Sequence, residues 1–197
     1  MSDIIERLSA LNTKKQMLFG LLASERFFIC YIIFSKIQKF GNVSHLQYAN
    51  RLIEKLILGE SISLDQIDES LEKVYKGIPH MDDFGSVNGS LALNVGGIIY
   101  ETLSLAKEYE IRRLKDISTF CTDSIDFLIL EIEDYDQMDF EKISNHSLMK
   151  EELNMQNGII GYLEKIQQPD SVDIETLRGL QSEREFDKLN LEKIFGE

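Results

Sequence analysis

One short loop gathers the side chains best suited to acid–base or metal chemistry. His80, Asp82 and Asp83 lie within four residues of one another in the loop 79–84. An imidazole and two carboxylates could hold a divalent cation or exchange protons with a substrate. The same pattern is typical of a loop in which an Asp caps the following helix while Phe84 fills the core. Both interpretations stay open, and the capping interpretation is the simpler one.

A second candidate is the adjacent pair Glu25 and Arg26, which lies in an otherwise apolar segment. Neighbouring residues on a helix point about 100° apart, so these two side chains do not pair with each other. Each needs a partner on another helix or a ligand between helices, and a buried ion network is the simpler explanation. If the fold brought this pair to His80, Asp82 and Asp83, the five residues would suit a small metal-dependent or hydrolytic enzyme.

Motifs that mark cofactor or metal sites are missing from the sequence. It contains no glycine-rich phosphate loop, and its three histidines are not spaced for a helical metal site. The two cysteines, Cys30 and Cys121, lie among apolar neighbours and are typical of unreactive core thiols. The sequence therefore predicts no cofactor, no metal and no disulfide framework, which favours a reducing cytoplasm.

Acidic residues are unevenly distributed along the chain. Residues 1–60 carry 8 basic and 5 acidic side chains, whereas residues 61–197 carry 13 basic and 29 acidic ones, within a formal net charge of −13. Between residues 116 and 141 there are nine acids and no base. Proteins that bind nucleic acid without sequence preference, or that dock on anionic lipid, need an excess of Lys and Arg. The composition disfavours both classes, and we expect a basic protein partner.

The segment 17–34 is apolar enough to raise the question of membrane insertion. Glu25 and Arg26 lie at its centre, and each charge at mid-bilayer costs about 2.5–3.5 kcal/mol. We therefore expect a buried helix of a protein without a membrane span.

Helical periodicity extends over nearly the whole chain, and no useful stretch alternates as a strand would. Ser63 and Gln66 have capping-box spacing, Gly41 is expected to end the long second helix, and Gly96 with Gly97 predicts a closely packed central helix. After a short N-terminal helix, the pattern predicts helices over about residues 14–39, 44–58, 64–77, 87–109, 113–135, 147–167 and 173–187. We predict an all-α, single-domain irregular bundle of seven to eight helices over residues 1–197, with 188–197 as a docked or frayed tail.

The predicted helix 113–135 divides into an apolar and an acidic face at 100° per residue. The apolar face, expected in the core, holds Leu114, Ile117, Cys121, Ile125, Leu128, Ile129, Ile132 and Tyr135. The acids on the other face are Asp116, Asp123, Asp126, Glu131, Glu133 and Asp134, and among them lie Phe120, Phe127 and Leu130. Either the predicted helix 147–167 or the loop 136–145 buries the two aromatic side chains, or they anchor a partner on an acidic surface.

Three functions remain open from these observations. The leading hypothesis is a non-enzymatic protein-binding module whose acidic face engages a basic partner, most concretely a bacterial immunity or antitoxin-type inhibitor of a basic toxin domain. The second is the enzyme centred on His80, Asp82 and Asp83. The third is a homo-oligomeric helical scaffold with Phe120 and Phe127 at its interface, which the repulsion of like-charged faces disfavours.

Several short motifs resemble one bacterial family. They are Glu25-Arg26 in a long early helix, Leu71-Glu72-Lys73 before Ile78-Pro79, and Asp82-Asp83-Phe84 just after it. The chain resembles the YjaG-like family, a domain of unknown function, over roughly residues 17–165. This resemblance implies an all-helical fold and brings no established reaction. The family pattern also places Pro-Asn soon after Glu-Arg, where this chain has Ile29-Cys30.

Overall fold

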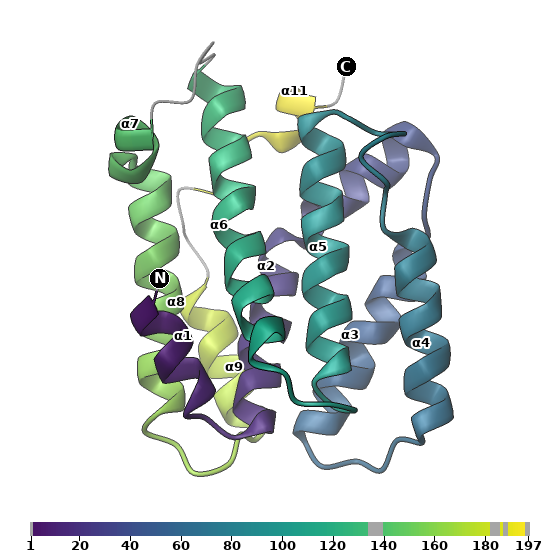
Figure 1. The fold of residues 1–197 in the computed structure, drawn as a ribbon, viewed down its shortest axis with the longest axis vertical. Coiled ribbons are helices and arrows are strands. Elements are labelled where there is room, and N and C mark those ends of the chain that lie inside the picture. Colours follow the sequence, from purple (N-terminus) through teal and green to yellow (C-terminus); the bar gives the residue numbers. More distant parts are fainter. Residues whose placement is uncertain (1, 134–139, 182–185, 187–188, 196–197) are drawn as a thin grey trace.

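The computed structural model describes residues 2–133, 140–181, 186 and 189–195. This part of the chain contains ten helices and no strand. In chain order they are α1 (Ser2–Ser9), α2 (Thr13–Gln38), α3 (Val43–Ile57), α4 (Leu64–Gly77), α5 (Val87–Ser104), α6 (Ile111–Glu133), α7 (Phe140–Asn145), α8 (Ser147–Leu163), α9 (Ser171–Leu180) and α11 (Leu191–Phe195). Most of them lie side by side in one bundle (Figure 1), and the predicted all-α fold is confirmed.

Helix starts follow local capping chemistry, as the sequence predicts. The capping box at the start of α4 is confirmed. The Ser63 side chain accepts a hydrogen bond from the backbone N–H of Gln66, and the Gln66 side chain accepts one from the backbone N–H of Ser63. The range predicted for α2, about residues 14–39, agrees within one residue with Thr13–Gln38, but the cap predicted at Gly41 is wrong. Lys39, at φ 54°, is the left-handed residue that ends α2, and Gly41 takes φ 74° in the turn that follows.

Several predicted helix ends shift where tertiary contacts decide them. α5 ends at Ser104 instead of near residue 109. Arg113, in the first turn of α6, pairs with Glu101 of α5 and with Glu110 of the connection, both at 2.8 Å, and so ties the chain reversal to α6. α7 and α11 are short helices that the sequence pattern did not indicate.

α5 is the central helix, as its glycines predict. It packs chiefly against α2 and α6 and also against α3 and α4 (Figure 1). A Cβ placed on Gly96 would lie 2.6 Å from Ile78, and one on Gly97 would lie 2.7 Å from the Phe120 ring. Only glycine admits both neighbours at this distance, so the two residues permit the close packing of α5.

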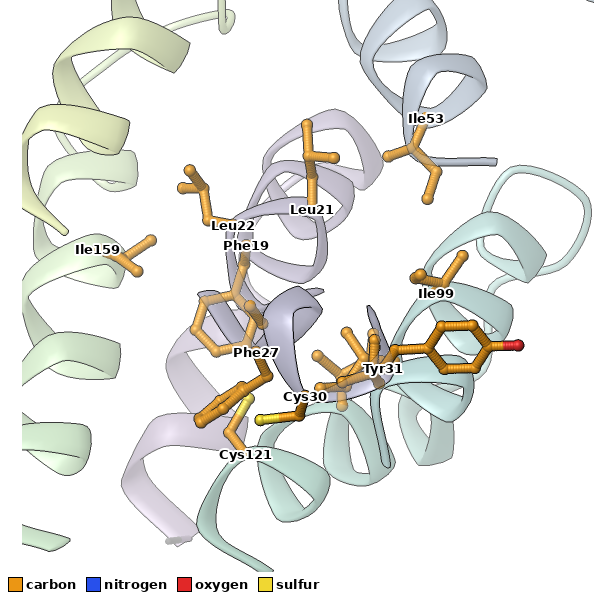
Figure 2. Close-up of a cluster of buried hydrophobic side chains, with 14 of the residues drawn as sticks. Phe19, Leu21, Leu22, Phe27, Cys30, Tyr31, Ile53, Ile99, Cys121 and Ile159 are labelled. Carbon is orange, nitrogen blue, oxygen red and sulfur yellow. The ribbon is translucent and has the colours of Figure 1, made fainter. Parts of the chain in front are cut away.

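The long apolar helix α2 runs through the interior of the bundle. Figure 2 shows it between Ile159 of α8 on one side and Ile99 of α5 on the other, with Phe19, Leu22 and other side chains of α2 filling the space. By length and composition α2 could cross a membrane, but 78% of its most apolar window is buried inside the protein. Its hydrophobicity is thereby accounted for by core packing.

The end of the chain lies against α2. α11 contacts α2, the Leu191 side chain is buried, and Lys36 Nζ lies 3.6 Å from Glu192 Oε1. Of the predicted tail 188–197, residues 188, 196 and 197 lie outside the described part of the chain.

Candidate functional site

Arg26 finds its partner on α8, inside the core. Its Nη2 donates to Glu152 Oε1 at 2.7 Å, and the two side chains are only 2% and 3% exposed. The same Glu152 oxygen accepts from Gln156 Nε2 at 2.7 Å, and Ser118 Oγ of α6 donates to Gln156 Oε1 at 2.7 Å. This buried polar network therefore joins α2, α8 and α6.

Glu25 finds its partner on α9. The Arg178 guanidinium donates from Nη2 to Glu25 Oε1 at 2.5 Å and from Nε to Glu25 Oε2 at 3.0 Å. Arg178 Nη2 also lies 2.6 Å from Glu54 Oε2 of α3, and Nη1 contacts Glu175. These carboxylates raise the pKa of Arg178, Glu25 first among them. The expectation that Glu25 and Arg26 each pair with another helix is confirmed.

The loop with His80, Asp82 and Asp83 is exposed to solvent. His80 Nδ1 lies 3.4 Å from Asp82 Oδ2, and the Asp82 side chain is 90% exposed. The expectation that an Asp caps the next helix is wrong, because Ser86 caps α5 by accepting from the Gly89 N–H. Phe84 does fill the core edge, as predicted, with its ring centroid 5.3 Å from that of Phe34.

The structure does not bring the loop and the Glu25 site into one described pocket. The groove beside Glu25 has a volume of about 430 Å³, and the described residues that line it come from α2, α3 and α9, with none from the loop. Among the described residues, no group of three or more His, Cys, Asp or Glu side chains is arranged to hold a metal ion.

The core face of α6 agrees closely with the sequence pattern. Its buried members are Leu114, Ile117, Cys121, Ile125, Leu128 and Ile129. Ile132, near the end of α6, is instead 37% exposed, because the helix extends past its neighbours there (Figure 1). Tyr135 lies outside the described residues.

The outer face of α6 carries aromatic and apolar side chains that are only half-buried. Phe120, Phe127 and Leu130 pack against the edge of the core and keep part of their surface in solvent. Phe120 lies over Gly97, so α5 supports it. From the sequence we expected α8, which is the predicted helix 147–167, or the loop 136–145 to be the cover. The sequence alone does not show that the missing side chain at Gly97 leaves space on α5 for the Phe120 ring.

The acids of this outer face differ in their surroundings. Asp116 pairs with Arg112 at 2.9 Å, and Glu133 lies 3.5 Å from His146 Nε2. Asp123 and Asp126 are half-buried, and neither has a hydrogen bond or ion pair with a described residue. Burial raises the pKa of both carboxyls, and burial together with the Asp123 charge raises that of Asp126 to about 6.

The remaining predicted acids lie at the end of α6. Glu131 and Glu133 are exposed, and Asp134 falls outside the described residues. Within α6 this face therefore combines two desolvated carboxylates, half-exposed aromatic rings and solvated acids at one end. A surface of this composition attracts cations and also offers apolar contact area.

Comparison with known proteins decides the family. The model of a family described as "Protein of unknown function (DUF416)" matches residues 3–189. The chain belongs to the DUF416 family. A crystal structure of a DUF416 family protein from Shewanella baltica OS155 is 22% identical, with a TM-score of 0.78 over 90% of this chain and 92% of that one. This likeness shows a shared fold. No curated protein matches the chain.

Sequence reasoning missed six residues of this DUF416 protein that complete its polar networks: Glu54, Ser118, Glu152, Gln156, Glu175 and Arg178. One signal was present in the sequence. Glu152 and Gln156 occupy positions that the buried residues of α8, from Leu148 to Leu163, define at helical spacing. A Glu at one of the buried positions of a helix indicates that it has a buried partner.

Proposed function

We propose that this DUF416 protein is a non-enzymatic binding module, acting in a reducing cytoplasm, whose α6 outer face engages a basic protein. The observation that carries the proposal is the half-buried pair Asp123 and Asp126, which has no cationic partner among the described residues. Two desolvated carboxylates one turn apart repel each other and lose hydration. A Lys or Arg from a partner would relieve both costs.

Other partly or fully buried carboxylates of the chain support this proposal by contrast. Glu152 pairs with Arg26, Glu25 with Arg178, and Glu101 with Arg113, each at 2.8 Å or less. Burial of an acid in this protein is thus commonly accompanied by a guanidinium. The Asp123–Asp126 pair departs from that pattern, and unpaired, perturbed groups of this kind concentrate at binding sites.

The most concrete version of the proposal is an immunity or antitoxin-type inhibitor that covers a basic toxin domain. The charge of the α6 face would accelerate association, while Phe120 and Phe127 would supply the contact area. Within the DUF416 family, we further propose that the chain belongs with the YjaG-like members, on the motifs Glu25-Arg26 and Asp82-Asp83-Phe84.

The proposal is tested by affinity capture from a native bacterial lysate at low ionic strength, with mass spectrometry as the readout. Wild-type protein should retain a small set of basic proteins, and Asp123→Asn/Asp126→Asn should lose them. Raising the salt concentration should release them, because exposed charges are screened within about 8 Å at physiological ionic strength.

Asp65→Asn is the matched control, because it removes an exposed carboxylate from the first turn of α4 and leaves α6 unchanged. It should retain the same proteins as the wild type. Retention of no basic protein by the wild type, or equal retention by the double variant, would contradict the proposal. Capture of a second copy of this chain alone would instead support the scaffold function.

A further inference from the structure

The half-buried side chains of the α6 outer face follow a heptad spacing. Phe120, Asp123, Phe127 and Leu130 recur at intervals of three, four and three residues, and all four are half-buried. We call these four residues the outer stripe. Intervals of this kind place side chains along one line of a helix, where they contact a second helix packed alongside. α6 thus has an inner seam that the bundle covers and a second seam facing outward.

Acidic residues flank the outer stripe at the positions where coiled-coil helices exchange charges. Asp126 and Glu133 are on one side of the line, and Glu131 is on the other. In paired helices these flanking positions select the partner by opposite charge. No basic residue lies between 116 and 141 to supply that charge from within α6.

We infer that the outer stripe of α6 is the seam for a basic amphipathic helix of the partner, an inference that rests on the proposed function. Apolar side chains of that helix would contact Phe120, Phe127 and Leu130. A Lys or Arg facing Asp123 and others flanking the seam would complement the acids. The stripe covers 11 residues from Phe120 to Leu130, or about 15 Å of helix axis at 1.5 Å per residue.

The test uses two synthetic peptides of about 18 residues each, which is about five helical turns. Both contain the same Leu, Ala, Lys and Arg residues. In the first peptide the apolar residues form one helical face flanked by the bases, and in the second the order is permuted so that no face is apolar. The inference predicts that the first peptide binds the full-length protein at least about tenfold more tightly, and that its helicity rises on binding.

Protein variants locate the site of binding. Phe127→Ala should weaken binding of the first peptide about tenfold, the usual effect of losing a central aromatic contact. Tyr48→Ala is the control, because Tyr48 is a 40% exposed aromatic residue on α3 and lies off the stripe. Circular dichroism and thermal unfolding would establish that both variants are folded, and the comparison of the two peptides on the wild type needs no variant.

Three results would overturn the inference. In the first, the two peptides bind equally well and Asp123→Asn/Asp126→Asn weakens the binding of both. This result would show that charge alone is recognised, and the proposed function would then stand without a helix seam. Binding of neither peptide would also overturn it and leave the proposed function to the lysate capture. A dimer in sedimentation experiments that Phe127→Ala dissociates would assign the stripe to a second copy of the chain.

Discussion

Arg26 Nη2 of α2 lies 2.7 Å from Glu152 Oε1 of α8, although 126 residues separate them in the chain. The Arg26 guanidinium also lies over the Phe27 ring, with its carbon 4.9 Å from the ring centroid. Its Nε and Nη1 are buried and make no hydrogen bond to any described residue. The ion pair therefore balances the charge of Arg26 without satisfying all of its hydrogen-bond donors.

Removing one member of this buried pair should be costly. Glu152→Gln leaves the Arg26 charge uncompensated in the core, and we expect it to lower the free energy of unfolding by about 3–5 kcal/mol. Arg26→Met/Glu152→Leu removes both charges and should recover most of that loss. Urea denaturation monitored by circular dichroism measures each variant. A loss below about 1 kcal/mol in Glu152→Gln would show that the charge of Arg26 is compensated in another way.

The stability of the protein should depend on the protonation of Asp126. Burial first, and the Asp123 charge second, raise the pKa of Asp126 to about 6 from an ordinary value of 3.8. The folded protein therefore binds this proton more tightly than the unfolded chain does, and stability falls as pH rises from about 4 to about 6. Asp126→Asn should flatten that slope and be more stable than the wild type above pH 6.

Urea denaturation at a series of pH values would measure this dependence. Asp65→Asn is again the control and should keep the wild-type slope. An Asp126→Asn variant that loses stability at pH 7 and keeps the slope would contradict the assignment of this carboxyl as desolvated and unpaired.

Two helical glycines should respond in opposite directions to alanine. A Cβ on Gly20 of α2 would lie 2.0 Å from Thr102 Oγ1 of α5, whereas one on Gly158 of α8 meets nothing within 4 Å. Gly20→Ala should destabilise the protein by about 1–3 kcal/mol through overpacking. Gly158→Ala should stabilise it by about 0.5–1 kcal/mol through helix propensity. Thermal unfolding distinguishes them, and equal effects would show that α2 and α5 are less closely packed.

Arg178 should hold α9 on the bundle. Arg178→Met leaves Glu25 and Glu54 close together with their shared cation removed. We expect the backbone amides of α9 to exchange about tenfold faster with solvent, with little change in α5. Arg7→Met is the control, because Arg7 pairs with Glu164 at a more exposed site, and exposed pairs contribute about 0–1 kcal/mol. Unchanged exchange in α9 would mean that its apolar residues alone dock it.

Local patterns in the sequence determined much of the fold. The capping box of Ser63 and Gln66 and the buried face of α6 both follow from spacing and backbone chemistry. These features depend on residues within a few turns of one another, so no long-range information is needed. The same spacing also indicated that Glu25 and Arg26 must pair with other helices.

Only the tertiary structure decided which residues those partners are and how deeply the α6 outer face is buried. Arg178 lies 153 residues from Glu25, and its position depends on the packing of α9 against α2. Phe120 is half-buried because Gly97 of α5 leaves space for its ring. The raised pKa of Asp126 likewise arises from its surroundings in space. Burial and long-range pairing depend on how helices distant in the chain pack together, and helical periodicity contains no information about that packing.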